Sequence, residues 1–259
     1  MADKPIDVDV KQAVHDLFLT PNAYRLDDTF VIRDGQRHPF AVLCPGGGYQ
    51  MVCSFIEGKP LARRLNEQGV SAFIVYYHVK KKARYPGPQE DLARAIREIL
   101  NKKDEYCLNA EDYSVWGSSA GGHLAASFGT EHMGYPHYGL PRPHALVLAY
   151  PVITMEPTLT HMKSHDLLLG KAASRETEEF ASVERHVTSD YPPTFLWCGD
   201  ADQTVSPENT RRMAAALERS SVPVQCHIFP GVGHGVGPGT GTAAEGWIQK
   251  ALEFWREQR

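Results

Sequence analysis

The sequence predicts an α/β fold in which a mainly parallel sheet is flanked by helices. From residue 40 onward, short apolar runs alternate with amphipathic stretches, and this alternation is typical of β-α-β units. The apolar runs are continuous, as expected for strands that are covered on both faces. With 259 residues and a hydrophobic fraction of 42%, the chain can bury a sizeable core in one domain.

Each expected strand is a short run of apolar, β-branched or aromatic residues. These runs are residues 40–44, 71–77, 113–117, 145–150, 194–198 and 224–229. Residues 1–39 fit the repeat poorly, and we expect them to supply one or two antiparallel edge strands around Thr29–Arg33. Cys44, Cys198 and Cys226 lie in apolar runs, so we expect buried thiols there.

The expected helices lie between these strands and have start and stop signals. They are residues 57–68, 88–103, 120–128, a helix that begins at Ser206-Pro207, and 243–255. Ser206 offers a hydroxyl cap, and the proline after it suits the first helical position. Gly69 ends the first helix.

Residues 152–193 interrupt the repeat and contain only one expected helix, at 176–184. Because they fall between two strands of the sheet, we interpret them as a small cap over the carboxyl edge of the strands. The expected organisation is a single domain over residues 1–259 with a cap insertion at about 152–193.

The composition excludes several classes of protein. The net charge is −4, and like charges do not cluster beyond pieces such as Lys80-Lys81-Lys82. We therefore expect no binding to nucleic acid, and no binding to a membrane through a polybasic segment. No signal peptide or membrane span is expected. The five cysteines lack metal-binding spacing, so we expect no metal site, and free thiols in a cytoplasmic protein. We also expect no cofactor. A homodimer stays possible.

The motif that predicts chemistry is Gly117-Ser118-Ser119-Ala120-Gly121, a G-x-S-x-G pentapeptide. It stands between the apolar run YSVW and the small-residue helix GHLAASF. A serine on such a strand-to-helix turn is held clear of the sheet, and the helix N-terminus behind it favours developing negative charge. We therefore expect Ser119 to be a nucleophile; the alternative is a glycine-rich turn without chemistry.

A serine nucleophile of this kind needs an acid and then a histidine, on loops after later strands. Asp202 follows the run TFLWC and is the expected acid, while Asp200 is the alternative, with a turn or helix cap as its structural role. His234 follows the run VQCHIF in a glycine loop and is the expected base. In this scheme His234 takes the Ser119 proton, and Asp202 fixes the tautomer of the ring.

An oxyanion hole requires backbone N–H groups aimed at the tetrahedral oxygen. One donor is expected from Ala120, the residue after the nucleophile, and the other from Gly47 or Gly48 in the loop Pro45–Tyr49. The three glycines are not part of a phosphate-binding motif, so the alternative is a merely flexible loop. Glu57 follows this loop, and it either orients the loop or favours a helix N-terminus.

The other histidines are not expected to belong to the catalytic group. His123 lies just behind the nucleophile and is expected to pack and form hydrogen bonds. His161 and His165 lie in the expected cap, where they are either surface residues or line the pocket. His132 and His137 lie in a loop rich in proline, glycine and tyrosine, and we expect no metal there.

With these residues identified, the sequence resembles small bacterial α/β-hydrolase esterases of the acetyl esterase or acetylxylan-esterase-like kind, related to the hormone-sensitive-lipase group. The resemblance covers about residues 40–258 and rests on PGGGY, GSSAGGHLAAS, YPVITM, PPTFLWCGDADQTVSPENT and GVGHG. It implies an α/β-hydrolase fold with about eight strands. It also implies hydrolysis of short acyl, especially acetyl, esters, with a small ester or an acetylated saccharide as substrate.

Two departures from that group concern the site and the N-terminus. Pro45 stands where the hormone-sensitive-lipase group has the histidine of His-Gly-Gly-Gly, although the glycine donors remain. The region before the first run is short, which puts the usual first strands in doubt.

The sequence leaves three alternative functions open. They are a peptidase or amidase of the prolyl-oligopeptidase type, a thioesterase or lactonase, and a hydrolase-like binding protein without catalysis.

Overall fold

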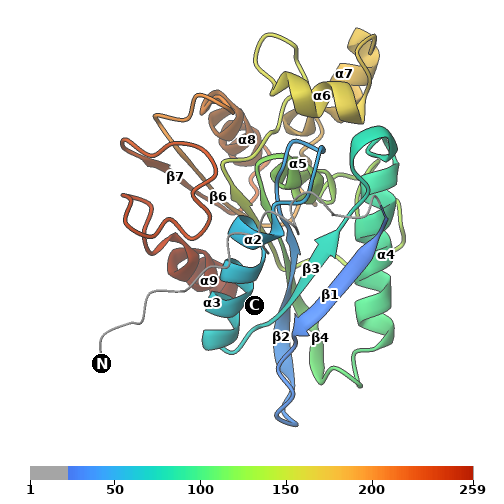
Figure 1. The fold of residues 1–259 in the computed structure, drawn as a ribbon, viewed down its shortest axis with the longest axis vertical. Helices are drawn as coiled ribbons and strands as arrows, with labels where there is room; N and C mark the ends of the chain where they lie inside the picture. Colours follow the sequence, from blue (N-terminus) through green and yellow to red (C-terminus); the bar gives the residue numbers. More distant parts are fainter. Residues whose placement is uncertain (1–22, 259) are drawn as a thin grey trace.

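The computed structural model describes residues 23–258, and its centre is one sheet (Figure 1). Within that part of the chain the sheet has seven strands in the order β1-β3-β2-β4-β5-β6-β7. All neighbours are parallel except β1, which pairs antiparallel with β3. The expected antiparallel edge strand is confirmed, but it lies at Arg25–Phe30. The expected number of strands, about eight, is one more than the described residues form.

The remaining strands lie close to the predicted apolar runs. They are β2 His38–Cys44, β3 Ser71–Tyr76, β4 Leu108–Ser118, β5 Ala145–Ala149, β6 Thr194–Gly199 and β7 Val224–Phe229. Every residue of β3, β5 and β6 is buried, which agrees with continuous apolar runs covered on both faces. β7 is only half-buried because it lies at the end of the sheet. Cys226 in β7 is therefore exposed, and the prediction of a buried thiol there is wrong.

The helices form two groups that cover the sheet (Figure 1). They are α2 Ser54–Glu57, α3 Lys59–Glu67, α4 Gly87–Asn101, α5 Ser119–Ser127, α6 Met162–Leu168, α7 Arg175–Ala181, α8 Glu208–Arg219 and α9 Trp247–Glu257, with 3-10 turns η1 Lys80–Lys82 and η2 Val183–Arg185. α4 packs on α5, and α5 and α8 both contact η2. α3 and α9 lie together, and Arg256 of α9 donates to the carbonyl of Gln68 after α3.

Two predicted helices differ in their boundaries. The helix expected at 57–68 is divided at Gly58 into α2 and α3. The helix expected at 243–255 begins only at Trp247, because Gly246 before it adopts a left-handed conformation with φ of 87°. No helix within residues 23–258 is long and apolar enough to cross a membrane.

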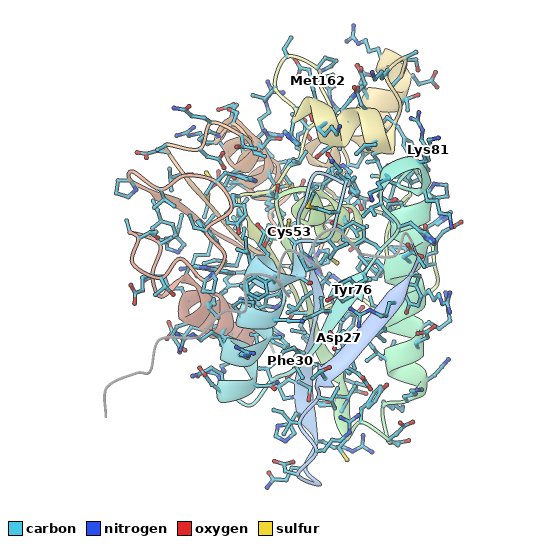
Figure 2. The ribbon with its side chains drawn as sticks, viewed as in Figure 1. Asp27, Phe30, Cys53, Tyr76, Lys81 and Met162 are labelled. Carbon is cyan, nitrogen blue, oxygen red and sulfur yellow. The ribbon has the colours of Figure 1, made fainter. Side chains whose placement is uncertain are left out.

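Residues 152–193 hold α6, α7 and η2, and the first two of these lie beyond the carboxyl ends of the strands, in yellow at the top of Figure 1. Figure 2 shows Met162 of α6 standing above Cys53, the residue that precedes α2. His165 joins the two short helices, because its ring nitrogens lie 3.1 Å from carboxylate oxygens of Asp166 and Glu178. The sequence did not predict α6, which has only seven residues.

Candidate active site

Ser119 stands at the junction of β4 and α5, where the strand turns directly into the helix. Its φ of 54° lies in the left-handed region, which is unusual for a residue with a side chain. The turn needs glycine at position 121, because a Cβ there would collide with the carbonyl oxygens of Cys44 and Pro45. The G-x-S-x-G spacing therefore allows β4, α5 and the end of β2 to meet closely at this serine.

His234 lies in the loop after β7 and is hydrogen-bonded to Ser119. The Ser119 hydroxyl is 2.8 Å from His234 Nε2, and His234 Nδ1 is 2.6 Å from Asp202 Oδ2. Because the carboxylate accepts from Nδ1–H, Nε2 is left to accept from the serine hydroxyl. The structure thus brings together the three residues that the sequence analysis singled out from separate loops.

The two candidate acids have different surroundings. The Asp202 side chain is fully buried, and its other oxygen, Oδ1, accepts hydrogen bonds from the backbone N–H groups of Thr204 and Val205, both at 2.9 Å. Asp200 is exposed and accepts from the backbone N–H of Gly231 at 2.6 Å. Asp200 therefore joins the loops after β6 and β7, while Asp202 faces the histidine.

The glycine loop after β2 packs directly against the serine. A Cβ on Gly46 would lie 2.7 Å from Ser119 Cβ, so no side chain fits there. Within residues 23–258, neither Gly47 nor Gly48 donates its backbone N–H to another group. Ala120 lies in the first turn of α5, where backbone donors have no acceptor within the helix. Within the described residues, no backbone carbonyl is therefore seen to accept from the N–H groups of Gly47 and Gly48, and that of Ala120 has no acceptor inside its helix.

Glu57 and Tyr150 form a buried pair beside this loop. Glu57 Oε2 accepts from the Gly46 N–H at 2.7 Å, and Oε1 accepts from the Tyr150 hydroxyl at 2.9 Å. Burial raises the pKa of the Glu57 carboxyl, although the two hydrogen bonds and the nearby His234 act in the opposite direction. Glu57 thus contacts the glycine loop, as one of the two readings of its position predicted. Tyr150 is not among the predicted site residues, since its one signal in the sequence is its place at the carboxyl end of a strand.

The other histidines near the site differ in burial. His123 is fully buried: its Nε2–H donates to the Ala181 carbonyl at 2.9 Å, and Nδ1 accepts from the Tyr49 hydroxyl at 3.0 Å. His161 is half-buried and lies beside the glycine loop. A Cβ built on Gly48 would lie 3.3 Å from Cε1 of its ring. His165 is buried, so its reading as a surface residue is wrong.

The two histidines of the loop after α5 contact neighbouring aromatic groups. The His132 ring lies 4.2 Å from the His186 ring between centroids, and the His137 ring contacts Tyr138. Among residues 23–258, no group of three or more histidine, cysteine, aspartate or glutamate side chains is arranged to hold a metal ion.

Residues 32–217, well over half of the sequence, match the model of the family described as BD-FAE. The chain belongs to the BD-FAE family. The matched region of this BD-FAE protein includes Ser119 and Asp202 and ends before His234.

The BD-FAE chain is similar in sequence to two curated proteins and in structure to a solved hydrolase. It is 31% identical over 227 residues to Endo-1,4-beta-xylanase B of Butyrivibrio fibrisolvens, covering 84% of this chain and 35% of that protein. It is 29% identical over 203 residues to Acetylxylan esterase of Xylanibacter ruminicola, covering 76% and 40%. The crystal structure of the acetyl ester-xyloside bifunctional hydrolase from Caldicellulosiruptor lactoaceticus has a TM-score of 0.83 and 31% identity, covering 92% and 89%.

These findings establish the fold and the family of the BD-FAE chain. The α/β-hydrolase fold predicted from the sequence is confirmed by the sheet and by its structural neighbours. The expected kinship with acetylxylan-esterase-like hydrolases is confirmed as well. The chain spans well under half the length of the two curated relatives, 35% and 40%.

Proposed function

We propose that this protein is a carboxylic ester hydrolase in which Ser119 is the nucleophile, His234 the general base and Asp202 the acid that orients it. The observation that carries the proposal is the continuous hydrogen-bond chain from Ser119 Oγ through His234 to Asp202. A nucleophile joined to a base, with the base oriented by a third group, is the arrangement that acyl transfer requires.

In the first half of the reaction, Ser119 Oγ attacks the ester carbonyl carbon while its proton passes to His234 Nε2. The negative charge that develops on the carbonyl oxygen is stabilised by the N–H of Ala120 and by those of Gly47 and Gly48. The bond from carbon to the alcohol oxygen then breaks, and His234 returns the proton to the departing alcohol. The acyl group stays on Ser119.

In the second half, a water molecule takes the place of the alcohol. His234 removes a proton from the water, whose oxygen attacks the acyl-serine carbonyl through the same oxyanion site. The bond to Ser119 Oγ breaks, the proton on His234 returns to that oxygen, and the carboxylic acid leaves. Asp202 stabilises the protonated ring in both halves without itself taking the proton.

We propose an acetyl ester of a saccharide, such as an acetylated xylo-oligosaccharide, as the substrate class. The names of two relatives, an acetylxylan esterase and an acetyl ester-xyloside hydrolase, support this assignment. The fold by itself leaves the alcohol part open, so the substrate has to be tested directly.

The deciding experiment measures acetate release from acetylated xylo-oligosaccharides, acetylated glucose and p-nitrophenyl acetate, with p-nitroacetanilide as the amide counterpart. We expect hydrolysis of the esters, and a Ser119→Ala variant should lose about 10⁴-fold or more in kcat, as other triads do. Ser127→Ala, at the other end of the same helix, is the matched control and should keep near-normal turnover.

Two results would contradict the proposal. Near-normal turnover by the Ser119→Ala variant would exclude this serine as the nucleophile. Faster hydrolysis of the anilide than of the esters would favour the amidase alternative.

A further inference from the structure

A buried carboxylate lies at the point where two loops of the site meet. Glu57 is only 5% exposed, and each of its oxygens accepts one hydrogen bond, from Gly46 N–H and from the Tyr150 hydroxyl. A Cβ on Gly46 would lie 2.7 Å from both Glu57 Oε2 and Ser119 Cβ. The carboxylate therefore supports the glycine loop from beside the serine.

Tyr150 extends this contact to the loop that carries the histidine. Its hydroxyl accepts from the backbone N–H of Gly237 at 3.1 Å, and its ring packs edge-on to the His234 ring with centroids 4.9 Å apart. Tyr150 has a φ of 38°, an unusual conformation for a residue with a side chain. One chain of contacts thus runs from Gly46 through Glu57 and Tyr150 to the His234 loop.

We propose that Glu57 and Tyr150 are positioning residues that fix the glycine loop and the His234 loop relative to each other around Ser119. The inference rests on the proposed function and deepens it. Gly46 N–H is occupied by Glu57, which leaves the N–H groups of Gly47 and Gly48 to bind the oxyanion. The tyrosine holds the ring of His234 from the side while Asp202 holds it at Nδ1.

The charge on Glu57 also acts on the ring of His234. Burying a carboxylate is costly, and two hydrogen bonds only partly offset that cost. Among the described residues, the ionisable groups of Asp202, Glu57 and His161 interact with His234, Asp202 through its hydrogen bond and His161 from residues 152–193. The carboxylate of Glu57 attracts the ring when it is protonated, which is the state that forms as Ser119 attacks.

The test uses Glu57→Gln, Tyr150→Phe and the double variant of the whole chain, assayed for kcat and KM with p-nitrophenyl acetate. Each single variant should lower kcat about 10- to 100-fold and change KM less than about threefold, because displacement of reacting groups by about 1 Å costs up to about 100-fold. The double variant should fall no further than the worse single variant, because the two residues act as one unit.

Asp91→Asn is the matched control, because Asp91 is also a buried carboxylate that accepts from a backbone N–H and a side chain, both of His78. It should lower the melting temperature about as much as Glu57→Gln and leave kcat near that of the wild type. A loss of kcat in Asp91→Asn equal to that in Glu57→Gln would show a general effect of stability and overturn the inference.

Other outcomes separate this inference from the proposed function. A wild-type protein that hydrolyses no ester overturns both. An active wild type with an inactive Ser119→Ala variant, but with Glu57→Gln at normal or raised kcat, overturns the positioning role alone. Additive losses in the double variant would show that Glu57 and Tyr150 act separately, and would also overturn it.

Discussion

The helix behind Ser119 and the loop after β7 each carry a histidine, and the two rings have opposite surroundings. His123 on α5 is fully buried between the Tyr49 hydroxyl and the Ala181 carbonyl, two uncharged groups. His234 in the loop is partly open, with 16% of its side chain exposed, and lies between a carboxylate and the serine hydroxyl.

Under the proposed function, this difference distinguishes a structural imidazole from the reactive one. Burial lowers the pKa of His123 to about 4, so its ring stays neutral and keeps both hydrogen bonds. The Nδ1 of His234 is hydrogen-bonded to the buried carboxylate of Asp202, and its Nε2 to the Ser119 hydroxyl, whose proton it takes in the proposed mechanism. Closeness to Ser119 in the sequence therefore does not indicate which histidine is the base. The hydrogen-bond partners of the two ring nitrogens are the better indication.

Replacing each histidine in turn gives the largest expected contrast. His234→Ala should lower kcat for p-nitrophenyl acetate about 10⁴-fold, because the serine then has no base. His123→Gln should stay within about tenfold of the wild type, measured at a temperature where the variant is fully folded. Equal losses in the two variants would remove the distinction between the reactive and the structural ring.

The two aspartates of the loop after β6 sharpen the same contrast. Asp202→Asn should lower kcat about 10³-fold or more, because an amide no longer fixes the tautomer or stabilises the protonated ring. Asp200→Asn is the matched control two residues away and should change kcat less than about threefold, since Asp200 accepts only from the Gly231 N–H in the described structure. A larger loss in Asp200→Asn would move the acid to that position.

The features that sequence analysis predicted well have local signals. Buried strands such as β3 and β5 are continuous apolar runs, and the loops after successive parallel strands must meet at one edge of the sheet. That topology is why residues 119, 202 and 234 could be grouped from the sequence. Their catalytic roles stay predictions until the variants are measured.

The features it missed depend on contacts between distant segments. Tyr150 and Glu57 are 93 residues apart in the sequence, and nothing local indicates that a strand-end tyrosine meets the carboxylate beside the glycine loop. The start of α9 was placed too early because the glycines before it favour turns that only the folded loop reveals. His165, which the sequence places either at the surface or along the pocket, is buried against Glu178 of another helix, a contact that has no local signal in the sequence.

The smallest predicted effect concerns stability and tests the structural histidine. The folded protein keeps His123 neutral down to a pH of about 4, because burial lowers its pKa, whereas the ordinary value is 6.5. Between these values the unfolded chain binds the extra proton, so stability contributed by this group is present above pH 6.5 and is lost as the pH falls to about 4.

Urea unfolding from pH 7.5 to pH 4 should show this loss as a difference between wild type and His123→Gln. The free energy of unfolding of the wild type should fall by about 3 kcal/mol more than that of the variant over this range, because each pKa unit corresponds to about 1.4 kcal/mol. Tyr49→Phe removes one hydrogen bond but keeps the buried imidazole, so it should retain the pH dependence of the wild type. A parallel fall in wild type and His123→Gln would mean that the ring takes up a proton inside the fold, and His123 would then resemble His234 more than its surroundings indicate.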